Sequence, residues 1–327
     1  MNKTATKIII SIFCLIIFFC IVIFGQIAIV LNCSYPIGSR VVVNKENNCL
    51  SVDDNADIRI LQLADIQISG LGDSLKSFGV IKTIVENAKP DLIVLTGDNI
   101  MDDSQPSMLE HIINFFDEFE IPWATVMGNH DYRATAIPMK KQCELYEKSK
   151  YCLFKQGEVK NSYGNYHYNL VRNNQTIYTL MFMDNAVEIN QQHLDWYTQT
   201  LNQINIDNKY SDKIPSMLFF HKPLIDTYYA HLYALNFNKQ IDGEKREGIA
   251  YVYEDAGIFD KALEIGSTKA IIYGHNHRNN FIVDYYDIKL CFGLKSSKAA
   301  YHDTDLIGGN VYVLKADNSL VVERVFV

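Results

Sequence analysis

The sequence predicts a layered α/β (α+β) domain preceded by one N-terminal transmembrane helix. Three observations lead to this fold class. Short apolar segments alternate with amphipathic helical segments from residue 58 onward, an unbroken apolar run fills residues 8–31, and several predicted strands end in Asp, Asn or His. Such alternation is typical of a domain with a mixed sheet or two packed sheets. With 48% apolar residues, the 327-residue chain can supply the core of one large domain.

The first 57 residues are interpreted as a membrane anchor and its flanks. Residues 1–7 carry Lys3 and Lys7 and no acid, and residues 8–31 are about long enough to cross a bilayer as a helix. Because basic flanks stay in the cytoplasm, we expect a single-pass signal anchor with the remaining chain on the extracytoplasmic side. A cleaved signal peptide, which would make the protein secreted, is the alternative. Residues 32–57 are expected to form a juxtamembrane linker, and residues 58–327 the folded domain.

The cysteines beyond the anchor are compatible with an oxidising compartment. Cys33 is close to Cys49 in sequence, and Cys143 is close to Cys152, so both pairs are candidates for local disulfides, with Cys291 left alone. The formal net charge of -8 and the lack of a Lys/Arg cluster argue against nucleic acid as a partner. The sequence leaves the oligomeric state open.

The elements of the domain follow one another in a regular order. "IRILQLA" predicts a strand, the next sixteen-residue segment from Ser74 an amphipathic helix that ends before Pro90, and "DLIVLTG" a strand buried on both faces. A second helix and a third strand follow at 106–119 and 121–129. The rest of the chain predicts a hairpin at 166–171 and 176–184, a helix at 190–204, and strands at 215–221, 269–275, 280–286, 288–293 and 310–316.

Five predicted strand ends carry side chains that can bind a metal ion. They are "LAD" with Asp65, "LTGDN" with Asp98 and Asn99, "VMGNHD" with Asn129, His130 and Asp131, "LFFH" with His221, and "IIYGHNH" with His275 and His277. Ligand sites in α/β sheets lie beyond the carboxyl ends of the strands, so these side chains can converge. A single Asp after a strand is commonly a turn residue, but five such ends in one chain indicate a shared site.

These five blocks occur in the order found in the calcineurin-like metallophosphoesterase superfamily, which the chain resembles over residues 58–327. The resemblance is greatest to its purple acid phosphatase-like single-domain branch, and the motifs "GNHD" (128–131) and "GHNH" (274–277) are its most specific elements. It implies a four-layer αββα sandwich, in which two β-sheets lie between helices. It also implies two divalent metal ions, for which oxygen and imidazole ligands suit Mn, Fe, Zn or Mg.

The resemblance also implies a role for each residue of the five blocks. Asp98 would bridge both metal ions. Asp65 and His277 would complete the first position. Asn129, His221 and His275 would complete the second position. Such a pair of ions would bridge and activate a hydroxide for in-line attack on phosphorus.

Three further residues receive roles next to the metal ions. His130 would donate a proton to the leaving oxygen, and Asp131 would orient His130. Asn99 would either neighbour the substrate or order a loop.

Two positions depart from the family pattern. Met101 stands where the purple branch has a tyrosine ligand, so no purple ferric centre is expected. Gln67 stands where most members carry a histidine ligand to the first metal ion. Gln67 either coordinates that ion weakly through its amide oxygen or only hydrogen-bonds a metal-bound water. In both cases the first position should be weaker, or selective for harder ions such as Mn or Mg.

The leading hypothesis is a membrane-anchored metallophosphatase that hydrolyses phosphoric esters of small molecules or phosphoproteins. A phosphodiesterase of the same superfamily is one alternative, and a degenerate member that binds a phosphorylated ligand without turnover is another. Substrate selectivity would come from loops such as 69–77, 132–137 and 226–248, whose residues do not identify a leaving group.

Overall fold

The structure is a computed structural model that describes residues 37–52, 56–208 and 213–327. One compact unit spans Pro36–Val327. The predicted anchor at 8–31 lies outside the described residues, so it stays a prediction. Within the described ranges, no helix combines the length and the apolar character needed to cross a membrane.

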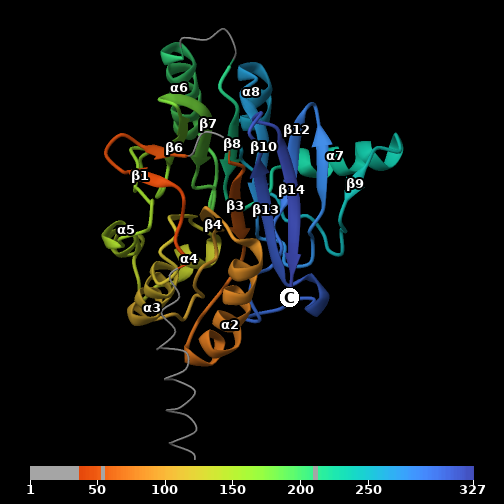
Figure 1. Cartoon of the computed structure of the whole chain (residues 1–327). Helices are drawn as coiled ribbons and strands as arrows, with labels where there is room; N and C mark the ends of the chain where they lie inside the picture. Colours follow the sequence, from red (N-terminus) through yellow and green to blue (C-terminus); the bar gives the residue numbers. More distant parts are fainter. Residues whose placement is uncertain (1–36, 53–55, 209–212) are drawn as a thin grey trace, which may run out of the picture. The chain divides into compact units, whose positions relative to one another are not determined.

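Two β-sheets form the centre of the domain (Figure 1). The five-stranded sheet has the order β14-β13-β3-β4-β5, and its strands are β3 (Ile58–Leu63), β4 (Leu92–Thr96), β5 (Trp123–Val126), β13 (Gly308–Leu314) and β14 (Leu320–Phe326). The nine-stranded sheet has the order β1-β2-β6-β7-β8-β10-β12-β11-β9. Its strands are β1 (Val42–Asn44), β2 (Cys49–Ser51), β6 (Tyr166–Arg172), β7 (Gln175–Phe182), β8 (Ser216–Phe219), β9 (Ile241–Asp242), β10 (Thr268–Tyr273), β11 (Ile282–Tyr285) and β12 (Ile288–Phe292).

Helices pack on both sheets. On the five-stranded sheet, α2 (Leu71–Ala88) contacts β3, β13 and β14, and α3 (Pro106–Asp117) packs beside α5 (Met139–Lys148). On the nine-stranded sheet, α8 (Ile258–Ile265) contacts β10 and α6 (Gln191–Asp207), and α7 (Ile225–Asn236) contacts β11. The short helices α4 (Asn129–Arg133) and η1 (Thr304–Leu306) complete the described elements.

The two sheets face each other across aromatic rings and a buried polar network. Phe219 of β8 meets Tyr312 of β13 edge-on, with ring centroids 6.4 Å apart. Gln62 of β3 is fully buried, donates to the carbonyl of Tyr273 at 3.0 Å, and accepts from the Tyr312 hydroxyl at 2.9 Å. A buried amide needs such partners, so these bonds fix the relative position of the sheets. The result is a mixed α/β sandwich.

Every strand and helix predicted from residue 58 onward is present, with ends that differ by a few residues. The prediction missed α7, which lies within the segment 226–248 that the sequence suggests is a loop. Tyr and Leu side chains on α7 are exposed, so the helix lacks a polar face that would reveal its period. The strand β14 and the helices α5 and α8 were also missed.

The structure corrects the predicted linker at residues 32–57. From residue 42 this segment contributes β1 and β2, which pair antiparallel, and β2 runs parallel beside β6. Leu50 of β2 is fully buried, and Arg40 donates two bonds to the Asp91 carboxylate at 2.8 and 2.7 Å. Each strand has three residues, which is too short to produce a pattern, so the domain begins earlier than the sequence indicates.

The structure also contradicts one of the two suggested disulfides. Cys143 and Cys152 are both free and buried. Burial raises the pKa of Cys143 to about 12, so this thiol stays protonated. Cys49 is free, and its suggested partner Cys33 lies outside the described residues.

We expect Leu50→Ala to lower the free energy of unfolding by about 2 to 3 kcal/mol, because it leaves a cavity in a closed core. Val42→Ala on the neighbouring strand is the matched control, since Val42 is 69% exposed. Urea denaturation of the two purified variants measures the difference. Equal midpoints would mean that residues 42–51 are a linker after all.

Candidate metal centre

The five strand ends meet between the two sheets. In the five-stranded sheet β3, β4 and β5 run parallel, so Asp65, Asp98 and Asn129 follow three carboxyl ends at one edge. In the nine-stranded sheet β8 and β10 run parallel, which brings His221 and His275 to the corresponding edge. The structure therefore unites residues that are as many as 210 positions apart in sequence.

The turns that carry these residues are tight. Asp65, Asp98 and His275 have φ values of 54°, 52° and 72°, a region that non-glycine residues seldom occupy outside functional sites. A Cβ atom at Gly128 would collide with the backbone and carboxylate of Asp98, and one at Gly274 would lie 2.6 Å from Asp65 Oδ2. The glycines of "GNHD" and "GHNH" therefore allow the carboxylates to approach.

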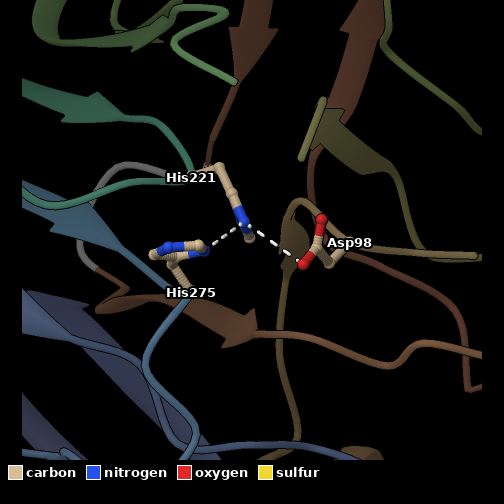
Figure 2. A group of neighbouring side chains, drawn as sticks. All are labelled: Asp98, His221 and His275. Atoms are coloured by element: carbon tan, nitrogen blue, oxygen red, sulfur yellow. Dashed lines mark hydrogen bonds and ion pairs between the residues drawn. The ribbon is translucent and has the colours of Figure 1, made fainter. Parts of the chain in front are cut away.

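Four acceptor atoms converge at the second position, which we define by Asp98, Asn129, His221 and His275. His221 Nε2 lies 3.1 Å from His275 Nδ1, 3.2 Å from Asn129 Oδ1 and 3.3 Å from Asp98 Oδ2. Figure 2 shows His221 between the other two titratable side chains. His221 Nδ1 faces the carbonyl of Thr96 at 2.9 Å, which keeps a proton on Nδ1, so Nε2 is the nitrogen that offers a lone pair once a cation displaces its proton.

This donor set fits a divalent cation. One proton on His221 Nε2 can satisfy only one of its three neighbours, whereas a cation attracts all four lone pairs at once. Asp98, His221 and His275 also form a group whose ligand atoms all lie within 4.8 Å of one another. Carboxylate, amide oxygen and imidazole suit Mn, Fe or Zn.

The charges at the second position depend on one another. Burial opposes the charge of His221, but the neighbouring Asp98 carboxylate prevails and raises the pKa of His221 to about 9. Against its own burial, Asp98 keeps its charge because His221 holds its pKa low. Burial, together with the charge of His221, lowers the pKa of His275 to about 3, so His275 stays neutral. A neutral imidazole is the form that binds a metal ion.

The first position, defined by Asp65, Asp98, His277 and Gln67, has a different composition. Asp65 accepts the backbone N–H of His275 at 2.9 Å, and His277 Nε2 lies 3.6 Å from Asp65 Oδ1. His277 Nδ1 faces the carbonyl of Tyr301 at 2.9 Å, so Nε2 has its lone pair directed at the site. Gln67 is buried, and its Nε2 lies 3.4 Å from Asp98 Oδ2. An amide N–H is no metal ligand, so this position has one donor fewer than the family pattern.

The sequence analysis missed Lys295, which lies beside this position. Lys295 is 1% exposed and donates to the backbone oxygen of Asp65 at 2.5 Å and to Gln67 Oε1 at 3.1 Å. Burial lowers the pKa of Lys295 to about 8, although Asp65 and Asp98 act in the opposite direction. The only signal in the sequence is a lysine directly after the uncharged run LCFGL at residues 290–294.

His130 has a partner that the sequence analysis did not identify. Its Nδ1 lies 2.6 Å from Oδ1 of Asp102, and its Nε2 lies 3.9 Å from Asp98 Oδ2. The prediction that Asp131 orients the imidazole is wrong. The Asp102 carboxylate is half exposed on the loop after β4. Acidic residues are common on exposed loops, so its position in the sequence does not indicate this contact.

Asp131 instead fixes the backbone beneath the site. It is fully buried and accepts three backbone N–H bonds, from Asn99 at 3.0 Å, Ile100 at 3.1 Å and Gly128 at 2.7 Å. The side chain of Asn99 is also buried and donates to Thr125 and Tyr146. Of the two suggested roles for Asn99, the structure supports loop ordering rather than substrate contact.

A cleft of about 410 Å³ opens beside the second position. Asn129 and His275 reach its wall, and Arg133 and Lys222 add two cationic side chains. Tyr251 and Tyr253 stand on its rim with their rings 5.4 Å apart.

The fold, with imidazole and carboxylate side chains collected at strand ends between two sheets, is that of a phosphoesterase with a candidate metal site. The chain belongs to the calcineurin-like phosphoesterase family, whose profile matches residues 58–279. The resemblance inferred from the motifs is thereby confirmed.

Known proteins resemble the chain at moderate identity. "Probable inactive purple acid phosphatase 28" of Arabidopsis thaliana is 25% identical, over 73% of this chain and 70% of the plant protein. "Phosphatase DCR2" of Saccharomyces cerevisiae is 28% identical, over 75% of this chain and 49% of the yeast protein. A dimetal phosphatase from Danio rerio shares the fold, with a TM-score of 0.52 and 10% identity, over 81% of this chain and 98% of that one.

The assignments of Asp102 and Asp131 can be separated by substitution. Asp131→Ala should lower the free energy of unfolding by about 3 kcal/mol, because three buried N–H groups lose their acceptor. Asp102→Asn should leave stability unchanged and shift the ring resonances of His130 in histidine-labelled protein. Asp103→Asn, one residue further on, is the control that should change neither. Shifted His130 resonances only in a folded Asp131 variant would restore the original assignment.

Proposed function

We propose that this chain hydrolyses phosphate monoesters at a metal centre whose second position is formed by Asp98, Asn129, His221 and His275. The observation that carries the proposal is the convergence of three acceptor atoms on His221 Nε2, within 3.3 Å. That arrangement suits a cation, and family membership supports a phosphoric ester as the substrate.

A divalent cation bound there would polarise the phosphoryl oxygens and lower the pKa of a water molecule. The side chains divide the remaining tasks. Asn129 and His275 line the cleft and lie at the metal position at the same time, so a phosphate in the cleft is adjacent to the cation. Arg133 and Lys222 match the dianion of a monoester better than the single charge of a diester.

His130 is the proposed proton donor. Asp102 accepts from Nδ1 and stabilises the imidazolium, while Nε2 faces Asp98 and the site. A positioned acid of this kind typically contributes a factor of about 10² to 10⁴ in rate. The backbone N–H of His130 is bound to Asp98 Oδ1 at 2.8 Å, which fixes the ring relative to the ligand.

The second candidate is a protein that binds a phosphorylated ligand without hydrolysing it. The amide N–H of Gln67 at the first position is the observation that favours it. The intact second position, together with His130, favours the enzyme. A phosphodiesterase is distinguished from a monoesterase by whether it hydrolyses a substrate whose phosphorus carries two ester bonds.

We expect the purified chain to hydrolyse an aryl phosphate monoester, and a chelator to abolish this activity. His130→Asn should lower kcat by about 10² or more while metal content is retained. A chain that binds metal and phosphate but shows no turnover with any of Mn, Zn, Fe or Mg would support the binding protein instead.

Arg133→Ala should raise KM for the monoester about tenfold with little change in kcat, because Arg133 lines the cleft and is not one of the metal ligands. Lys140→Ala is the matched control: Lys140 is exposed and lies on α5 outside the cleft. An unchanged KM in the Arg133 variant would remove this side chain from the substrate site.

A further inference from the structure

The side-chain amide of Gln67 has only one orientation compatible with its partners. Its oxygen lies 3.1 Å from Lys295 Nζ, and its nitrogen lies 3.4 Å from Asp98 Oδ2. A lysine ammonium can only donate and a carboxylate can only accept. If the amide were rotated by half a turn, its NH₂ would face the Lys295 ammonium, and its oxygen would face the Asp98 carboxylate. Neither pair could form a hydrogen bond. The group directed at Asp98 is therefore an NH₂ and not a ligand oxygen.

Lys295 is held in this place by the backbone. Ala64, which precedes Asp65, forms an isolated parallel bridge with Lys295. The N–H of Ser296 donates to the Ala64 carbonyl at 2.9 Å, and the Ser296 hydroxyl accepts the Ala64 N–H at 3.0 Å. The segment after β12 is thus fastened to the end of β3, which brings the lysine from a distant part of the sequence to the Asp65 side of the centre.

We propose that Lys295 and Gln67 close the first metal position, so that this chain holds a single divalent cation at Asp98, Asn129, His221 and His275. The Lys295 ammonium then supplies the positive charge that a second cation would bring to Asp65. This inference rests on the metal centre of the proposed function and replaces the two-metal expectation from the family pattern.

Two physical effects act together against a second cation. First, Asp98 Oδ2 already faces His221 at the second position and the Gln67 amide at the first, and Asp98 Oδ1 accepts the His130 N–H. Three of the four lone pairs of this carboxylate thus already have partners. Second, the carboxylates of Asp65 and Asp98 carry two negative charges. Lys295 compensates one and a divalent cation overcompensates the other, so a second divalent ion would enter a region that is already positive.

The test counts metal ions and does not depend on turnover. The full-length chain is purified, stripped with a chelator, equilibrated with Mn²⁺ and freed of excess ion. Elemental analysis then gives Mn per chain, and electron paramagnetic resonance distinguishes an isolated Mn²⁺ from two ions within about 4 Å, whose spins couple. The test variant is the double substitution Gln67→His with Lys295→Met, which supplies an imidazole and removes the ammonium. Lys298→Met is the control, because Lys298 lies three residues further on and is exposed.

We expect one Mn²⁺ per chain and an uncoupled spectrum for the wild type and the control, and two ions with a coupled spectrum for the double variant. Two coupled ions in the wild type would overturn the proposal, and so would a folded double variant that still binds one. If the double variant does not fold, the wild-type count alone decides. One bound ion without phosphatase activity would refute the proposed function and leave this inference standing, whereas two ions with activity would do the reverse.

Discussion

The buried carboxylate of Asp98 is the constraint on which the site depends. It is 2% exposed, and an ionised carboxylate removed from water must be compensated by charge and hydrogen bonds. The compensation comes from both sheets: the His130 N–H, the His221 imidazole and the Gln67 amide all face it. Their packing around one side chain explains why the sheets meet here and why glycine is required at position 128.

The buried carboxylate of Asp65 must also be compensated by charge and hydrogen bonds, but the groups that do so are different. Asp65 receives a backbone N–H from His275, faces His277, and has the Lys295 ammonium against its own carbonyl. In the proposed single-metal arrangement the Asp98 side would bind an exchangeable cation, while the Asp65 side has the Lys295 ammonium, which is part of the chain. This difference between the two sides follows from the path of the chain after β12. The bridge between Ala64 and Lys295 places the lysine beside Asp65.

The sequence predicted the site better than its surroundings. Asp65, Asp98, Asn129, His221, His275 and His277 could be found because each follows an apolar strand, and strand ends collect at one edge. Their supporting partners could not be found in this way. Asp102 lies on an exposed turn, and Lys295 becomes significant only through a bridge to the distant residue Ala64. The strands β1 and β2 were not predicted because three residues are too few to show the alternation of a strand. The helix α7 was not predicted because its exposed face is apolar.

The partners that were missed determine what the site can do. Asp131 is buried and holds three backbone N–H groups, so it maintains the shape of the loops, while the His130 imidazole pairs with Asp102. Asp102 is half exposed, so its pair with His130 reaches solvent, from which the proposed proton donor could regain its proton. The carboxylate that orders the backbone and the carboxylate that pairs with His130 are thus different residues. In the proposed mechanism the proton for the leaving oxygen comes from His130, so a centre with one exchangeable cation would not need a second metal ion to supply it.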